Sequence, residues 1–295
     1  MLNQFVEMGE AEYGGDAVEL STLWAPLFFY EGNELCSEAQ SYYLPVAGGL
    51  GYGNLAETIA SNVEADIRLN SLVTEINYED ENVVISYNAN GLPRQVNART
   101  ALVTVSLGVL KAGAISFTPN LPDNKQDVID NMGFGLLNKM TMYWNDEEDV
   151  VWPNDSYWFN LVTEDDSTTG VWTSFFNPTK EKGVPCLIAW IAGDEAWAAE
   201  DNTDEEILEQ VMVNLKSMFP TLRQPDEYFI TRWGQEEHFR GSYSFSKAGR
   251  DHLEDAANLG ERVGNVWFAG EATDLAEWHA TTVGAWDSGE IAAGE

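Results

Sequence analysis

Residues 265–271, with the sequence NVWFAGE, decide the fold class of this 295-residue chain. The stretch begins as a mostly apolar run, which predicts a strand buried on both faces. Gly270 then lets the backbone approach a bound group closely, and Glu271 places a carboxylate at the carboxyl end of the strand. That end is where α/β sheets bind their ligands. An ordinary strand-to-loop turn is the alternative that this segment leaves open.

Further strands and helices precede this stretch. Residues 67–105 predict an antiparallel meander with a polar turn at 79–82 and a buried return strand at 101–105. Thr203 and Glu206 have capping-box spacing and predict the start of a helix. Other strands are expected at 136–144, 158–162, 170–176, 187–192 and 229–233, and helices at 55–63, 123–131, 203–219 and from 282 onward. The fold class is therefore α/β, or mixed α+β, with two sheets whose segments interleave along the chain.

The composition restricts the partners of the protein. The chain has 49 acidic and 15 basic residues, so its formal net charge is −34. Such a chain is repelled by nucleic acid and by anionic membrane surfaces, because both recruit clustered Lys and Arg. The charge either attracts cationic ligands or simply solvates the surface, and both readings stay open. Three histidines and two cysteines make a zinc site an unfavourable interpretation, so no metal is expected. No run of about 18 apolar residues predicts a transmembrane helix.

Gly51 and Gly53 form a G-x-G-x-x-A pattern ahead of the helix expected at 55–63. That pattern is the outline of a dinucleotide-binding turn. Pro45 precedes it, however, and a proline is unfavourable in a central parallel strand. A tight turn that packs a helix onto a sheet is therefore the favoured interpretation.

Lys139 lies in an otherwise apolar strand of a chain that has few basic residues. A buried lysine is costly unless it is paired, and its pKa falls easily. An edge-strand lysine that reaches solvent is the alternative. Near the C-terminus, Trp278 and Thr282 flank the start of a helix, where an aromatic ring can line a pocket or merely pack.

Four segments, taken in order, resemble one family. They are MGFGLLNK at 132–139, RW at 232–233 with RGSYS at 240–244, FAGEAT at 268–273 and WHATTVGA at 278–285. Together they resemble the C-terminal part of flavin-dependent amine oxidases, the family of polyamine oxidases and lysine-specific histone demethylases. The resemblance covers nearly the whole chain and implies a two-domain FAD-linked fold with interleaved cofactor-binding and substrate-binding sheets.

The resemblance also implies a role for each matching residue. Lys139 is the expected catalytic residue and holds a water against flavin N5. Trp278 and Tyr243 are expected in the aromatic cage that receives the substrate. The residues expected to contact FAD are Val73 on the adenine side, Trp233 near the flavin ring, Gly270 and Glu271 near the ribityl and diphosphate, and Thr282 at the flavin ring.

Domain boundaries follow from the same resemblance. Residues 1–45 and 111–228 are expected in the substrate-binding domain, and residues 46–110 and 229–295 in the FAD-binding domain. Two positions depart from the family pattern, because Trp278 replaces its usual tyrosine and Val283 its usual histidine. The family's N-terminal βαβ unit is also missing, which suggests a fragment.

The expected function is FAD-dependent oxidation of amines, with polyamines favoured. Hydride transfer to flavin N5 would yield an imine, then an aldehyde and an amine, and O₂ would be reduced to H₂O₂. The alternative is a truncated, catalytically incompetent fragment or binding module that cannot hold FAD alone. The compartment stays open, with a soluble, cytoplasmic protein as one reading.

Overall fold

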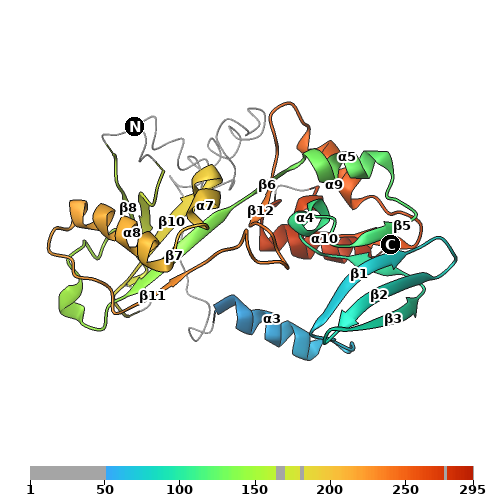
Figure 1. Cartoon of the computed structure of the whole chain (residues 1–295), viewed down its shortest axis with the longest axis horizontal. Coiled ribbons are helices and arrows are strands. Elements are labelled where there is room, and N and C mark those ends of the chain that lie inside the picture. The colour runs from blue at the N-terminus through green and yellow to red at the C-terminus, as the bar shows by residue number, and fades with distance from the viewer. Residues whose placement is uncertain (1–50, 164–169, 180–182, 276–277, 295) are drawn as a thin grey trace.

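The computed structural model describes residues 51–163, 170–179, 183–275 and 278–294. Two lobes lie side by side, each built around its own hydrophobic core (Figure 1). The expected mixed α/β fold is confirmed. The expected substrate-domain segment at 1–45 lies outside the described residues.

The first lobe contains a four-stranded sheet in the order β3-β2-β1-β5. Strands β1 (Ser71–Asn77), β2 (Val83–Ala89) and β3 (Leu92–Ala98) form the predicted antiparallel meander, and β5 (Ser116–Thr118) runs parallel to β1. The return strand β4 (Ala101–Val103) leaves this sheet and pairs in parallel with β13 (Val266–Phe268). The helices of this lobe are α4 (Leu107–Lys111), α5 (Asp123–Asn131), α9 (His252–Gly260) and α10 (Thr282–Gly294), and the short turn η4 (Glu271–Thr273) follows β13.

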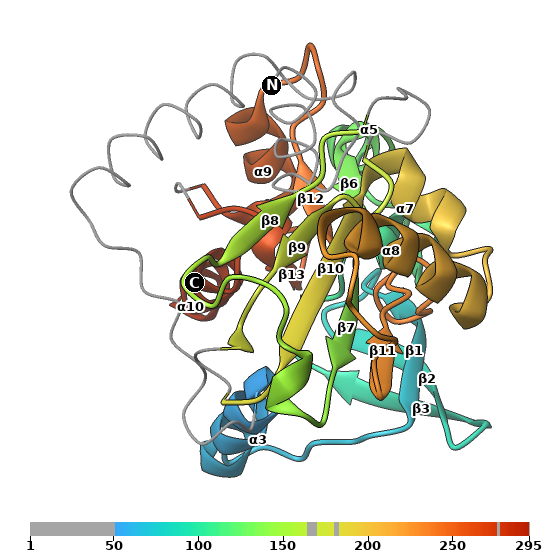
Figure 2. The ribbon, with the colours of Figure 1, turned by 90° about the vertical axis from the view of Figure 1, so that its left-hand side faces the viewer.

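The second lobe is a five-stranded antiparallel sheet in the order β11-β7-β10-β9-β8. Its strands are β7 (Leu137–Tyr143), β8 (Trp158–Asn160), β9 (Ser174–Phe176), β10 (Cys186–Ala192) and β11 (Glu227–Ile230). Helices α7 (Gly193–Ala199) and α8 (Asp204–Met218) accompany the sheet (Figure 2), and the 3₁₀ turn η2 (Glu147–Asp149) follows β7. The apolar face of α8 and the alternate residues of β7 and β10 share one core, so the opposite face of the sheet is the less buried one.

Helix α8 begins as the sequence predicts. Thr203 accepts a hydrogen bond from the Glu206 N–H, and the Glu206 carboxylate accepts one from the Thr203 N–H. This reciprocal pair satisfies two of the donors that every helix start leaves open. The buried residues Ile207, Val211 and Leu215 form the predicted apolar face.

Two short strands connect the lobes. Strand β6 (Gly133–Gly135) pairs with β12 (Tyr243–Phe245), and both lie between the two lobes in Figure 1. Met132 belongs to the first core and Leu136 to the second. The change of core therefore falls at 132–136. The domain boundary expected after residue 110 stays a prediction.

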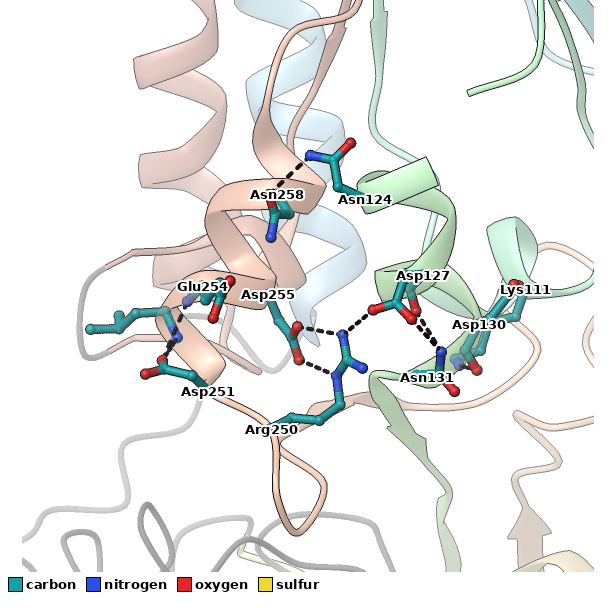
Figure 3. A network of polar contacts seen from close by, with 11 residues as sticks. Lys111, Asn124, Asp127, Asp130, Asn131, Arg250, Asp251, Glu254, Asp255 and Asn258 are labelled. Carbon is teal, nitrogen blue, oxygen red and sulfur yellow. Dashed lines mark hydrogen bonds and ion pairs between the residues drawn. The ribbon is translucent and has the colours of Figure 1, made fainter. Parts of the chain in front are cut away.

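Helices α5 and α9 are joined by an ionic network (Figure 3). Arg250 donates two hydrogen bonds to Asp255 on α9 and a third to Asp127 on α5. The sequence alone makes Asp123 or Asn124 able to cap the helix expected at 123–131. In the structure neither does so, because Pro122 is the N-cap residue of α5 and no side chain caps it. Asn124 instead donates to Asn258 on α9, so it joins the two helices.

Helix α3 (Gly51–Asn62) includes both glycines of the G-x-G pattern. The prediction of a turn at Gly51 and Gly53 is therefore wrong, because these residues already belong to the first helical turn. Most of the α3 side chains that the structure describes are exposed, including Leu55.

Candidate functional site

Lys139 lies at the centre of β7, which has β10 on one side and β11 on the other. The interpretation of Lys139 as an edge-strand lysine is therefore wrong. The Lys139 N–H donates to the Thr231 hydroxyl (2.8 Å), and the Thr231 N–H donates to the Lys139 carbonyl (3.0 Å). Met140 and Met142 point into the core, so the alternation of a strand places Lys139 on the opposite, less buried face.

The ammonium of Lys139 lies over the indole ring of Trp190, with 4.3 Å from Nζ to the ring centroid. Trp190 is the direct cross-strand partner of Lys139 on β10. Burial lowers the pKa of Lys139, because the charged form loses its water of hydration. Within the part of the chain that the structure describes, the Lys139 ammonium has no carboxylate partner.

The residue before Lys139 organises the next part of the site. Asn138 is buried, and its amide donates to the Glu200 carboxylate (2.7 Å). Its carbonyl oxygen accepts from the Trp233 N–H (3.1 Å), and the Glu200 carboxylate accepts from the Gly234 N–H (2.8 Å). Asn138 and Glu200 therefore fix the segment that carries Trp233. The Trp233 ring itself is 38% exposed and lies perpendicular to Phe239.

A second set of hydrogen bonds continues from Trp233 toward the first lobe. The Trp233 carbonyl accepts from Gly241, and Ser242 bonds to the backbone of both Gly135 and Leu137. Tyr243 follows directly and opens β12, where it pairs with Gly135. The strand that carries Lys139 and the segment that carries Trp233 and Tyr243 are thus held in one network.

Glu271 connects this network to the last helix. Its carboxylate accepts hydrogen bonds from the Ser244 N–H (3.0 Å), the Ser244 hydroxyl (2.7 Å) and the Ala280 N–H (2.9 Å). Burial raises the pKa of Glu271, and the three hydrogen bonds oppose that rise because they favour the charged form. The carboxylate therefore joins β12 to the turn ahead of α10.

Gly270 lines an open cleft at the carboxyl ends of β4 and β13. The backbone φ of Gly270 is +146°, and a side chain built there would meet no atom within 4 Å. The cleft has a volume of about 200 Å³ and is also lined by Ser106, Glu271 and Ala285. Parallel strands gather their ligands at this edge, so the cleft is a candidate binding position for an extended group.

Thr282 is the first residue of α10 and is exposed. The neighbouring Thr281 hydroxyl accepts from the Gly284 N–H (3.1 Å) and donates to the Trp278 carbonyl (2.6 Å). A side chain on Gly284 would collide with that same carbonyl, so the turn requires glycine there. The Trp278 side chain is 52% exposed.

Beside this turn, the rings of His279 and His252 lie 4.1 Å apart. His252 is buried, and its pKa falls to about 4, first through burial and then through the charge of His279. Burial also lowers the pKa of His279, against the opposing effect of Asp274. Both rings are therefore favoured in the neutral form at pH 7.

Val73 lies apart from this network. It is half-buried on β1 opposite Tyr87 and packs against the first core. Sequence reasoning missed Asn138, Glu200 and Ser244, which hold the network together. Asn138 carried a signal, because it is a polar residue on the same face of the strand as the apolar Met140 and Met142. Ser244 is the last residue of the RGSYS motif at 240–244, which was a signal for it, whereas Glu200 carried none.

The whole chain, residues 1–295, matches the family model described as flavin containing amine oxidoreductase. Polyamine oxidase 5 of Oryza sativa subsp. japonica is 36% identical over 247 residues, which cover 82% of this chain and 46% of that protein. Lysine-specific histone demethylase 1 homolog 1 of Arabidopsis thaliana is 36% identical over 230 residues, covering 74% of this chain and 26% of that protein.

A solved structure shows the same fold. Cyclohexylamine oxidase from Brevibacterium oxydans IH-35A superposes with a TM-score of 0.72 at 21% identity, over 99% of this chain and 63% of that one. The chain spans about half the length of the polyamine oxidases that it matches. The resemblance inferred from the four motifs is confirmed, and this chain belongs to the flavin-containing amine oxidoreductase family.

Proposed function

We propose that this chain forms the substrate-facing and C-terminal cofactor-binding parts of an FAD-dependent oxidase of amines, with polyamines as the favoured substrates. The observation that carries the proposal is the continuous network from Lys139 through Trp233 and Ser244 to Glu271. This network connects residues from all four motifs quoted in the sequence analysis. In this proposal the second lobe faces the substrate, and the first lobe faces the cofactor.

The described residues fit a flavin nucleotide in part. The cleft beside Gly270 has open space where a side chain would otherwise stand, at the carboxyl ends of two parallel strands. Gly270 and Glu271 would hold the cofactor there, with Thr282 and Trp233 beside its ring and Val73 toward its adenine end. When bound, FAD supplies a two-electron acceptor for the hydride on the carbon next to the amine nitrogen, and O₂ later accepts those electrons to give H₂O₂.

The residues of this chain would orient the substrate and exclude water. Lys139 presents an ammonium on the less buried face of its sheet and would hold a water molecule against flavin N5. Trp278 and Tyr243 would flank the substrate nitrogen with aromatic faces, which attract a cation. The net charge of −34 would increase the local concentration of polyamines. Hydrolysis of the imine product would give an aldehyde and an amine.

The second candidate is a chain that cannot hold FAD by itself. The observation that supports this candidate is that the match covers only 46% of the rice polyamine oxidase. In that case the fold is retained, but no stable flavin complex forms with residues 1–295.

A reconstitution experiment separates these candidates. The purified chain is mixed with FAD, passed through gel filtration and examined for flavin absorbance, and H₂O₂ release is then measured with spermidine. Retained flavin and spermidine-dependent H₂O₂ support the oxidase. Flavin that separates completely from the protein supports the second candidate. Flavin retained without H₂O₂ from any polyamine or monoamine would contradict the proposed activity. In a chain that binds FAD, Lys139→Met is expected to keep the flavin and slow either flavin reduction or its reoxidation.

A further inference from the structure

In the structure, the ammonium of Lys139 lies over the face of the Trp190 indole ring. Nζ lies 4.3 Å from the ring centroid, within the range in which a cation is attracted to the negative face of an aromatic ring. The two residues are direct partners across β7 and β10, so the antiparallel register fixes their relative position.

We propose that Trp190 is a positioning residue for Lys139. Its ring face holds the ammonium in place without using any of the three N–H donors, which stay available to a group bound in front of the sheet. The proposal rests on the proposed function, which gives Lys139 its catalytic role, and extends it to a residue outside the family motifs.

The choice of an aromatic partner has a chemical consequence. A carboxylate would hold Lys139 more strongly, but it would accept one or two of the N–H donors. The chain has 49 acidic residues, yet in the described ranges none forms an ion pair with Lys139. Burial lowers the pKa of Lys139, because the charged form loses its water of hydration. The ring face of Trp190, 4.3 Å from Nζ, offsets part of the hydration that the ammonium loses.

The packing around Trp190 keeps its ring in this orientation. Trp158 on β8 contacts it edge-on, with 5.2 Å between the ring centroids, and Phe176 on β9 packs against Trp158 at 5.2 Å. The Trp190 Nε1–H is buried and has no hydrogen-bond partner among the described residues. A buried donor without a partner is destabilising. Phenylalanine would avoid that cost, so a purely structural ring does not require an indole, whereas the cation benefits because tryptophan has the strongest negative face.

The test weakens the ring face and leaves its shape nearly unchanged. The full chain is produced with lysine carrying ¹³C at Cε, once with ordinary tryptophan and once with fluorinated tryptophan. The titration of each lysine is followed by NMR, and the Lys139 signal is assigned from Lys139→Arg. Fluorine withdraws electrons from the indole, so the ammonium of Lys139 loses stabilisation and its titration midpoint is expected to fall. Complete loss of such a cation–π contact would lower the titration midpoint of Lys139 by about 0.4–1.5 pH units. Fluorination only weakens the ring face, so it should produce a part of that fall.

Lys125 is the matched control in the same molecule. Its Nζ lies over the ring of Phe268 at 4.1 Å, and fluorinated tryptophan leaves that ring unchanged. The Lys125 midpoint should therefore stay constant while that of Lys139 falls. Trp190→Phe provides a second variant with a weaker face and should also lower the midpoint of Lys139.

An unchanged Lys139 midpoint in the fluorinated protein would overturn the proposal, as would an equal shift of Lys139 and Lys125. These results do not depend on bound flavin. If the reconstitution experiment yields no oxidase activity but Lys139 still responds, the proposed function fails and the Trp190 contact stands.

Discussion

Replacing Lys125 by methionine should change how the stability of the chain depends on pH. Lys125 is 1% exposed on α5, and its ammonium donates to the carbonyls of Asn258 (2.9 Å) and Leu259 (2.5 Å) at the end of α9. Burial lowers its pKa from 10.5 to about 8, and the charge of Glu261 opposes the change only in part. The difference corresponds to about 3 kcal/mol, at 1.36 kcal/mol for each pKa unit.

The sign follows from the protons bound in each state. Between the folded pKa of about 8 and the unfolded value of 10.5, the unfolded chain binds more protons at Lys125. The free energy of unfolding therefore rises with pH in this window, by up to about 3 kcal/mol. Methionine does not titrate, so Lys125→Met should lack this rise. Near neutral pH the free energies of unfolding of the two proteins should differ less than they do at about pH 9.5. At neutral pH the variant gains by not burying a charge, but it also loses two hydrogen bonds, and the two effects oppose each other.

Urea unfolding of the parent and of Lys125→Met, measured between about pH 7.5 and 9.5, gives the required difference. Lys216→Met, which removes an exposed lysine of α8, is the control and should follow the parent curve. Parallel stability curves for the parent and Lys125→Met would refute the reasoning, because they would show that Lys125 titrates alike in the folded and unfolded chain.

Three further changes test the site and the fold. Glu271→Gln should destabilise the chain at pH 7 by about 1–3 kcal/mol, because an amide cannot accept from all three donors. The raised pKa of Glu271 also predicts that the parent loses stability as the pH rises above 4.5, and Glu271→Gln should not show this loss. Thermal unfolding of both proteins across that pH range measures the difference. Thr203→Ala removes one half of the capping box and should lower the free energy of unfolding, measured in urea, by about 1 kcal/mol. A change smaller than the measurement error would mean that α8 does not depend on this cap. In a flavin-loaded enzyme, Trp278→Tyr should stay active and accept bulkier amines, while Trp278→Ala should lose roughly a hundredfold in kcat/KM for spermidine; equal values for parent and Trp278→Ala would show that Trp278 does not face the substrate.

The sequence determines the elements whose signals are local. The capping box at Thr203 and the meander from β1 to β3 depend on residues a few positions apart, and both form as predicted. The motif at Gly270 and Glu271 also lies where predicted, at the end of a buried strand. Local rules fail where a neighbour competes, as at α5, where Pro122 takes the N-cap position expected for Asp123 or Asn124.

Tertiary structure alone decides which distant residues meet. The apolar pattern around Lys139 was compatible with a buried strand or an edge strand, and only the order β11-β7-β10 places it inside the sheet. Trp190 lies 51 positions from Lys139, Glu200 lies 62 positions from Asn138, and Ser244 lies 27 positions from Glu271. Such pairs depend on which strands become neighbours in a sheet and on loop closure. A pattern with a period of two or 3.6 residues indicates the buried face of one element but does not identify its partner. The sequence therefore determined the elements, the charge and the family motifs, while the tertiary structure decided the partner of the Lys139 ammonium and the place where the two cores meet.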